Sequence, residues 1–150
     1  METIDRNKLE ELARKGLFED ILNIYVAYKN SSLDDLEIIK KYLTQAVIIR
    51  VDQCVDRRNL DPVLYLCYNE DLPKKAREYA GIVYVRELLK DKRYMEIKNF
   101  YNSIKSKSLE DLEGYCKMVL TKFFVEYDLS EDKWEKSKFE IFKKSLLNSK

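Results

Sequence analysis

Residues 61–100 read DPVLYLCYNEDLPKKAREYAGIVYVRELLKDKRYMEIKNF, and this stretch carries the start signals of two neighbouring helices. Asp61 followed by Pro62 is typical of a helix N-cap with proline at the first helical position, where the missing N–H costs nothing. Pro73 opens the next helix, whose apolar residues recur at three- and four-residue spacing. Because the connection between them is short, the two helices are expected to pack antiparallel.

The same kinds of boundary signal recur on both sides of this stretch. Asp5, Ser32, Ser108 and Ser130 stand where helix N-caps are expected, and Gly16 stands where a first helix would stop. The expected helices run from Asp5 to Gly16, from Leu17 to Tyr28, from Ser32 to about Asn59, from Asp61 to about Asn69, from Pro73 through Leu88, from Tyr94 to Ile104, from Ser108 through Tyr127, and from Ser130 through Leu146.

An internal repeat connects these helices. Three four-residue segments, VIIR at 47–50, VYVR at 83–86 and VLTK at 119–122, recur at 36-residue intervals. A period of this length is typical of helical solenoids, in which each repeat is a helix pair that buries its apolar face against its neighbours.

The stretch from Asp61 to Phe100 resembles a HEAT-type, armadillo-related helical repeat. Asp61 and Pro62 start its first helix, and Asp71 with Arg77 six residues later is similar to the Asp and Arg that tie neighbouring turns together in such repeats. The resemblance implies a short right-handed α-solenoid of about three antiparallel helix pairs with N- and C-terminal capping helices. Residues 33–54 and 109–127 lack this Asp/Arg spacing, so an irregular helical bundle stays open as the alternative.

Composition independently predicts an all-α fold. The 150 residues contain three glycines and two prolines, far fewer turn residues than a doubly wound α/β domain requires. A chain of this length fits a single helical-repeat domain, residues 1–150. With 28 Lys and Arg against 27 Asp and Glu, the net charge of +1 creates no global field toward nucleic acid or a membrane.

Several features indicate a cytoplasmic protein. The N-terminal residues METIDRNKLEELARKG carry four acids and lack the apolar core of a signal peptide. No apolar run approaches the roughly 18 residues of a membrane span. The three cysteines, Cys54, Cys67 and Cys116, are isolated from one another, which favours reduced thiols.

Catalytic and metal-binding motifs are missing from the sequence. The chain has no histidine, which excludes a Ser-His-Asp triad, a Cys-His pair and an HExxH zinc motif. Gly16, Gly81 and Gly114 stand alone, so no glycine-rich phosphate loop is formed, and three separated cysteines argue against a zinc site. We therefore expect a protein that is not an enzyme and that uses neither a metal nor a cofactor.

Arg50, Arg86 and Lys122 end the three repeated segments, and each interrupts an apolar run at the same point of its helix. In a solenoid the second helices line the inner surface, so these cations would form a ladder facing a groove that suits an acidic peptide or nucleic acid. The alternative is that their stems lie along the core while the charges pair with acids such as Asp52 or Glu87.

Three pairs of basic residues precede the first helix of each repeat. At helix C-termini such residues offset unsatisfied carbonyls and the negative end of the helix dipole. The alternative is that the three pairs line one basic edge of a solenoid and bind the phosphate backbone of a nucleic acid. The pairs are Arg14-Lys15, Arg57-Arg58 and Lys92-Arg93.

Aromatic residues offer further candidate contacts. Tyr25, Tyr65 and Tyr101 occupy equivalent positions and either pack in the core or present an aromatic binding surface. Trp134 and Phe142 belong to the last helix, which carries more apolar residues than an end cap needs. That helix either closes the final repeat or docks on another subunit as a homo-oligomer contact.

These observations favour a non-catalytic protein-interaction module or scaffold that presents a helical surface to a partner protein. The alternative is a nucleic-acid-binding HEAT-like protein that uses a basic edge. The candidate partner-binding residues are Arg50, Arg86, Lys122, Trp134 and Phe142, and the candidate phosphate-binding residues of the alternative are Arg14, Lys15, Arg57, Arg58, Lys92 and Arg93.

Overall fold

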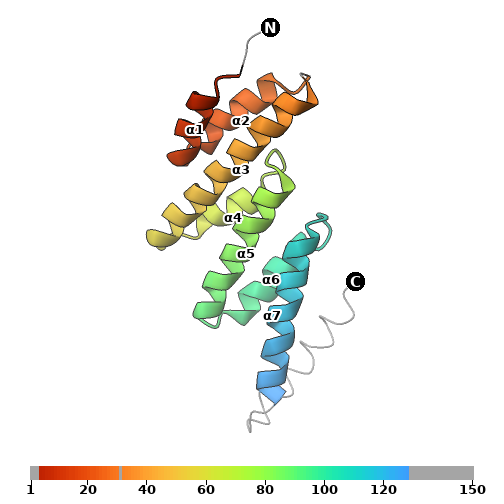
Figure 1. Cartoon of the computed structure of the whole chain (residues 1–150). Coiled ribbons are helices and arrows are strands. Elements are labelled where there is room, and N and C mark those ends of the chain that lie inside the picture. Colours follow the sequence, from red (N-terminus) through yellow and green to blue (C-terminus); the bar gives the residue numbers. More distant parts are fainter. Residues whose placement is uncertain (1–3, 31, 129–150) are drawn as a thin grey trace. The chain divides into compact units, whose positions relative to one another are not determined.

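The computed structural model in Figure 1 describes residues 4–30 and 32–128 and is helical throughout its regular structure. The all-α prediction is therefore confirmed for these residues, in which no strand occurs. The expected last helix, with Trp134 and Phe142, lies outside the described residues. The helices are α1 (Arg6–Arg14), α2 (Phe18–Ala27), α3 (Leu33–Asp56), α4 (Asp61–Tyr68), α5 (Lys74–Lys90), α6 (Tyr94–Ile104) and α7 (Glu110–Asp128).

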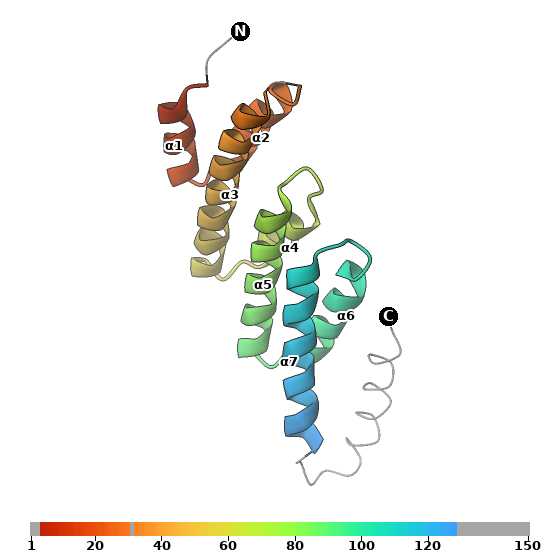
Figure 2. The same cartoon turned by 45° about the vertical axis from the view of Figure 1, so that its right-hand side comes forward.

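The chain divides into two compact units between Tyr84 and Val85, inside α5. In the first unit α1 and α2 both pack along α3, and α4 packs on α3 as well; the two views of Figures 1 and 2 show α3 beside α1 and α2. In the second unit α6 and α7 pack against each other. The finer prediction, a right-handed solenoid, stays a prediction, as does the irregular bundle.

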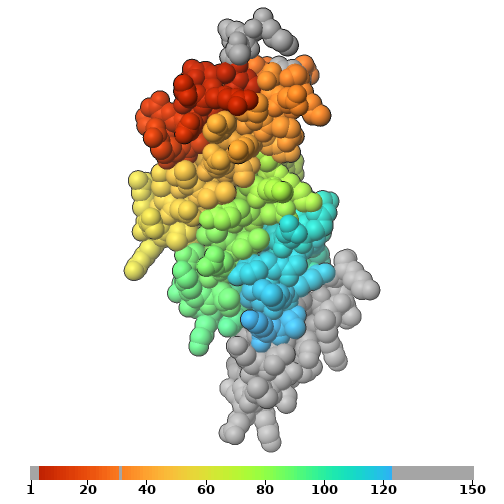
Figure 3. Space-filling model, in the orientation of Figure 1, coloured from red at the N-terminus to blue at the C-terminus, as the bar shows by residue number. Residues whose placement is uncertain are grey.

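The core of the first unit is organised around α3. Ile39, Leu43 and Ala46 are fully buried and recur at the spacing of the predicted apolar stripe. Leu9 of α1 and Ile21 of α2 are also buried, and both of these helices pack on α3. In Figure 3 the red side chains of α1 lie directly on the orange side chains of α3.

The core of the second unit is formed where α6 and α7 meet. Ile97, Phe100 and Ile104 follow one another at three- and four-residue spacing on α6 and are buried. Leu112 and Cys116 are fully buried on α7. Both units therefore bury apolar stripes that periodicity in the sequence indicates.

The helix caps confirm two predictions and correct two others. Asp5 accepts a hydrogen bond from the backbone N–H of Lys8 at 3.1 Å, and Ser32 accepts one from Asp35 at 3.3 Å. Asp61 is not the N-cap of α4: it is the first helical residue, and Leu60 stands at the cap with no side-chain bond. Ser108 is also not a cap, because it adopts a left-handed φ of 59° and α7 begins at Glu110.

None of the helices in the described part of the chain is long and apolar enough to cross a membrane.

Candidate functional site

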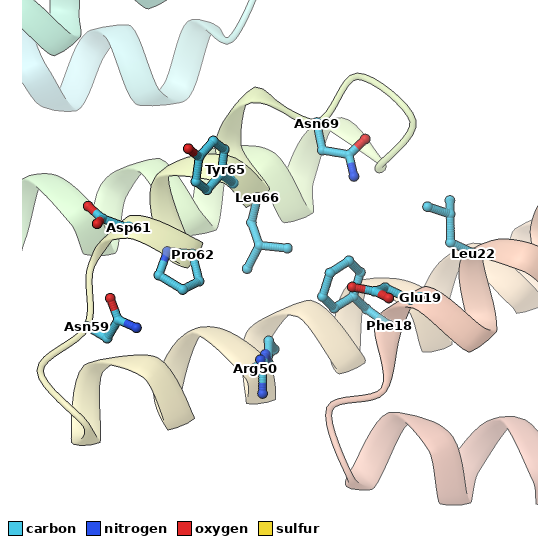
Figure 4. A pocket seen from close by; sticks show the side chains of 10 residues that line it. All are labelled: Phe18, Glu19, Leu22, Arg50, Asn59, Asp61, Pro62, Tyr65, Leu66 and Asn69. Carbon is cyan, nitrogen blue, oxygen red and sulfur yellow. The ribbon is translucent and has the colours of Figure 1, made fainter.

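A groove of about 540 Å³ opens in the first unit between α2, α3 and α4 (Figure 4). A volume of this size lies within the usual range of ligand pockets, roughly 300–1,000 Å³. Its apolar lining comes from α2 and α4, while its one cation, Arg50, comes from α3. The lining residues are Phe18, Glu19, Leu22, Arg50, Asn59, Asp61, Pro62, Tyr65, Leu66 and Asn69.

Gly16 positions the wall of the groove that belongs to α2. Its φ of 74° closes the end of α1, and a Cβ at this position would lie 3.3 Å from the backbone nitrogen of Arg50. The turn between α1 and α2 therefore rests closely on α3, where Gln53 Nε2 donates to the carbonyl oxygen of Lys15 at 3.4 Å. Phe18 follows this turn directly and is carried to the groove by it.

The opposite wall is the outward side of α4. Leu66 is 4% exposed and anchors α4 in the core, while its neighbour Tyr65 is 73% exposed. In Figure 4, Leu66 and Pro62 extend from α4 toward α3, with Phe18 on the far side of the opening. An exposed aromatic side chain beside a buried apolar floor is typical of protein-binding surfaces, in which tyrosine is enriched.

Three charged side chains line the groove without neutralising one another. Arg50 is half-buried, and it makes no ion pair with any residue that the structure describes. Glu19 and Asp61 are exposed and likewise form no ion pair within residues 4–30 and 32–128. In Figure 4, Asp61 and Glu19 lie at opposite ends of the opening, while Arg50 lies on α3 along its lower edge. Arg50 forms no ion pair with Asp52, whose Oδ1 accepts a hydrogen bond from the Tyr79 hydroxyl at 3.0 Å.

The other two members of the predicted cation ladder belong to the second unit. Arg86 of α5 and Lys122 of α7 are both exposed. Arg86 lies close enough to Tyr115 to influence it: burial raises the pKa of the Tyr115 phenol, and the positive charge of Arg86 opposes that rise. The suggested partner of Arg86, Glu87, forms an ion pair with Lys90 at 2.8 Å.

The three basic pairs coincide with one recurrent backbone motif. At each pair the helix ends in two nested hydrogen bonds, a 6→1 bond around a 5→2 bond, which together define a Schellman motif. The residue at its left-handed position is Gly16 after α1, Arg58 after α3 and Lys92 after α5, with φ values of 74°, 56° and 55°. The 6→1 bonds run from Leu17 N to Leu12 O at 3.0 Å, from Asn59 N to Cys54 O at 2.9 Å and from Arg93 N to Leu88 O at 3.0 Å.

This placement agrees with the interpretation that the basic residues offset the negative ends of helices. Lys15 is further occupied by an ion pair with Glu11 at 3.1 Å, and Arg93 Nε donates to Glu96 at 2.7 Å. The remaining four cations are exposed and make no ion pair inside the described part of the chain. They are Arg14, Arg57, Arg58 and Lys92.

Sequence reasoning misplaced one residue near these sites. Tyr101 is 2% exposed, so the alternative of an aromatic surface built from Tyr25, Tyr65 and Tyr101 is wrong for Tyr101. Arg77 donates from Nε to the carbonyl oxygen of Cys67 at 2.8 Å and therefore connects α5 to the C-terminus of α4. The backbone N–H of Asp71 donates to the Asn69 side chain.

Phe18, Leu22 and Asn59 line the groove but were not indicated by any motif. A signal was available for Phe18, because Gly16 marks a tight turn two residues before it. In the described residues no three Cys, Asp or Glu side chains gather closely enough to hold a metal ion. Comparisons with protein-family models, with curated proteins and with solved structures find no match to this chain.

Proposed function

We propose that this chain is a non-catalytic protein-interaction module whose groove between α2, α3 and α4 receives side chains of a partner protein. The observation that carries the proposal is Arg50, a half-buried cation without an ion pair among the described residues, in a groove with apolar walls. A partly desolvated charge gains most from a partner that supplies the opposite charge. Arginine and tyrosine also dominate binding energy at interfaces, and Tyr65 stands exposed at the same opening.

A repeat architecture would fit this role. The 36-residue recurrence of the segments ending at Arg50, Arg86 and Lys122 supports a short α-solenoid, which would present an extended and rigid surface. In that arrangement the groove at Arg50 would be the first of several positions along one partner-binding face.

The proposal is tested by comparing partner capture between charge-reversal variants. The full chain is immobilised as wild type, as Arg50→Glu and as Lys41→Glu, the last a matched reversal of an exposed cation of α3 outside the groove. Proteins lost with Arg50→Glu alone are purified and titrated calorimetrically. We expect Arg50→Glu to weaken binding about tenfold or more, since a desolvated charge contact contributes well over 1 kcal/mol, and Lys41→Glu to change it less than about threefold.

The control for this test is that all three proteins are equally well folded. Circular dichroism and urea unfolding should be nearly the same for all three proteins, because both substituted side chains reach solvent. Equal capture by wild type and Arg50→Glu, with both proteins folded, would contradict a partner-binding role for the groove.

The second candidate is nucleic-acid binding through the basic residues at the helix ends. Arg58 and Lys92 favour it, because each holds a left-handed backbone that glycine would adopt more cheaply and yet presents an exposed cation. Arg58→Gly distinguishes the structural role of Arg58 from a role in binding. The substitution relieves the left-handed backbone, which should stabilise the fold, and it removes the charge, which should weaken binding. Oligonucleotide affinity that falls with Arg58→Gly and declines steeply with salt would support this candidate, and no binding at about 50 mM salt would remove it.

A further inference from the structure

We infer that the groove between α2, α3 and α4 binds a peptide segment of a partner protein in which a large apolar side chain stands beside a single carboxylate, within a stretch of net positive charge. This inference rests on the proposed function and names the chemistry of the segment that the groove accepts. Three properties of the lining support it: the apolar side chains of the walls, the free amide groups and the balance of charge.

Each of the two helical walls presents a pair of apolar side chains. Phe18 and Leu22 are four residues apart on α2, so they lie on one face of that helix. Pro62 and Leu66 have the same spacing on α4. Phe18, Leu22 and Pro62 are half-buried and therefore keep contact area for an occupant. A groove of about 540 Å³ between apolar walls suits a group of the size of a large apolar side chain, because pockets of this volume enclose small ligands.

Side-chain amides at the two ends of α4 favour a polypeptide as the occupant. Asn59 precedes this helix, Asn69 stands at its C-cap, and both line the groove. The Asn69 Oδ1 accepts from the backbone N–H of Asp71, while the Asn59 side chain makes no hydrogen bond to any residue that the structure describes. A side-chain amide both donates and accepts, so these two groups match the N–H and C=O groups of a peptide backbone.

The charges of the groove favour one carboxylate in a segment that is otherwise basic. Arg50 is half-buried and has no ion pair among the described residues, so it gains from one carboxylate of the partner. Glu19 and Asp61 are exposed, lack ion pairs within the same part of the chain, and lie at opposite ends of the opening in Figure 4. Two acids against one base leave the lining with a net charge of −1. Further carboxylates of an occupant would therefore be repelled, while lysine or arginine would be attracted.

The same balance of charge disfavours a phosphorylated segment. A phosphate group carries about 1.5 to 2 negative charges near neutral pH, and the sites that bind phosphorylated peptides gather several arginines. Arg50 is the one cation of this groove, and both Glu19 and Asp61 would oppose a dianion. The two acids are thus specificity-determining residues of the site.

A selection from a random peptide library tests the inference on the full chain. The library is displayed on phage and selected on immobilised wild type. Lys41→Gln, which removes an exposed cation of α3 outside the groove, is the control variant. We expect the enriched peptides to share a large apolar residue next to one Asp or Glu, to have a net positive charge, and to bind wild type and Lys41→Gln equally.

Substitutions in an enriched peptide and in the chain are then combined, with dissociation constants measured by fluorescence anisotropy. Replacing the acid of the peptide by its amide should weaken binding to wild type about tenfold, but binding to Arg50→Gln less than about twofold, because the carboxylate has lost its cation there. The double variant Glu19→Gln/Asp61→Asn should bind a version of the peptide with two added acids about tenfold more tightly than wild type does. Circular dichroism checks that each variant is folded.

Four outcomes would overturn the inference: no enriched peptide, enriched peptides that lack an acid or are rich in acids, equal effects of the acid-to-amide replacement in wild type and Arg50→Gln, or no gain for the acidic peptide in the double variant. The proposed function fails separately, because it requires only Arg50-dependent capture of a protein. Such capture by a chain that enriches acid-rich peptides would retain the function and reject the single carboxylate.

Discussion

At the scale of single residues, the helix ends of this chain place arginine and lysine where glycine fits best. Arg58 and Lys92 have φ values of 56° and 55° in two Schellman motifs, while Gly16 fills the same position in a third. A left-handed conformation costs a residue with a Cβ roughly 1–2 kcal/mol, and glycine escapes that cost while adding freedom to the unfolded chain. The two effects partly cancel, and the backbone relief is the larger.

Arg58→Gly should therefore raise the free energy of unfolding by about 0.5–1 kcal/mol, a figure that includes the small loss of a cation near the negative end of α3. The measurement is urea unfolding followed by circular dichroism. Arg57→Gly is the matched control: it also removes an exposed cation, but its φ is −87°, so it relieves no left-handed backbone and should not stabilise. Equal effects of the two substitutions would show that charge, not backbone conformation, governs this turn.

The converse substitution concerns Gly16. Gly16→Ala should lower the free energy of unfolding by about 1–2 kcal/mol, because it puts a Cβ on a left-handed residue. The new Cβ would also stand 3.2 Å from Gln53 Oε1 and 3.3 Å from the backbone nitrogen of Arg50. Gly114→Ala is the control, since a Cβ there meets nothing within 4 Å on a helix and should stabilise slightly. A neutral Gly16→Ala would mean that the turn between α1 and α2 does not rest on α3.

Tyr115 supplies a residue-scale test of the second unit. Burial raises the pKa of its phenol above the usual value near 10, and Arg86 restrains that rise. A group whose folded pKa is raised stabilises the fold fully below its unfolded pKa and loses that contribution as the pH rises through the folded pKa. Arg86→Gln should therefore shift the Tyr115 pKa further upward and enlarge the loss of stability at alkaline pH.

The Tyr115 prediction is measured by NMR titration of tyrosine labelled with ¹³C at Cζ, with Tyr115→Phe to assign the signal. Lys122→Gln, which removes another exposed cation of the second unit, should leave the Tyr115 pKa unchanged. A pKa that stays constant or falls in Arg86→Gln would refute the proximity of the two side chains.

At the scale of elements, α4 is held by a hydrogen bond from its neighbour. The carbonyl of Cys67 belongs to the last turn of this short helix, whose C-terminal carbonyls lack partners within it. Arg77 of α5, only 9% exposed, donates to that carbonyl at 2.8 Å. Removing the donor loses a buried hydrogen bond to that carbonyl, and truncating the stem leaves a cavity beside it.

We expect Arg77→Ala to lower the free energy of unfolding by about 2–4 kcal/mol and to accelerate amide hydrogen exchange in α4 before the rest of the unit. The control is Arg86→Ala on the same helix, whose exposed side chain should change stability by less than about 0.5 kcal/mol. Uniform acceleration of exchange over the whole first unit would show that Arg77 supports the core and not the end of α4.

The helices themselves were largely predictable, because their signals are local. Asp5 and Ser32 cap helices where the sequence places them, and Ile39, Leu43 and Ala46 are buried as periodicity predicts. The predicted helix caps were wrong where the backbone conformation, and not the type of side chain, determines which residue begins the helix. Asp61 has the right chemistry for a cap but falls one residue inside α4, and Ser108 adopts a left-handed conformation that a sequence pattern does not reveal.

The groove was predictable only in part, because it is made by packing between elements. Arg50 and Tyr65 were singled out from the repeat, and both line it. Phe18 and Asn59 reach the groove because two turns bring α2 and α4 beside α3. The periodicity of apolar residues within a helix does not predict how neighbouring helices are placed by such turns. The same limit explains Tyr101, which the predicted repeat aligns with the exposed Tyr65 but which is buried.

At the scale of the whole molecule, the division inside α5 predicts a first unit that folds by itself. The side chains that bury α3, from Leu9 and Ile21 to Leu66, all belong to residues before Val85. A fragment of residues 1–93 keeps these side chains, the whole of α5 and the hydrogen bond from Arg93 N to Leu88 O that ends it. About 90 residues with a continuous core are enough for an independent domain.

We expect the 1–93 fragment to unfold cooperatively in urea, with a smaller denaturant dependence than the full chain because less surface becomes exposed. The measurement is circular dichroism across a urea series, with the full chain as the control. Broad, non-cooperative unfolding of the fragment would mean that α1 to α5 depend on residues beyond Arg93, and the two units would then be parts of one folding domain.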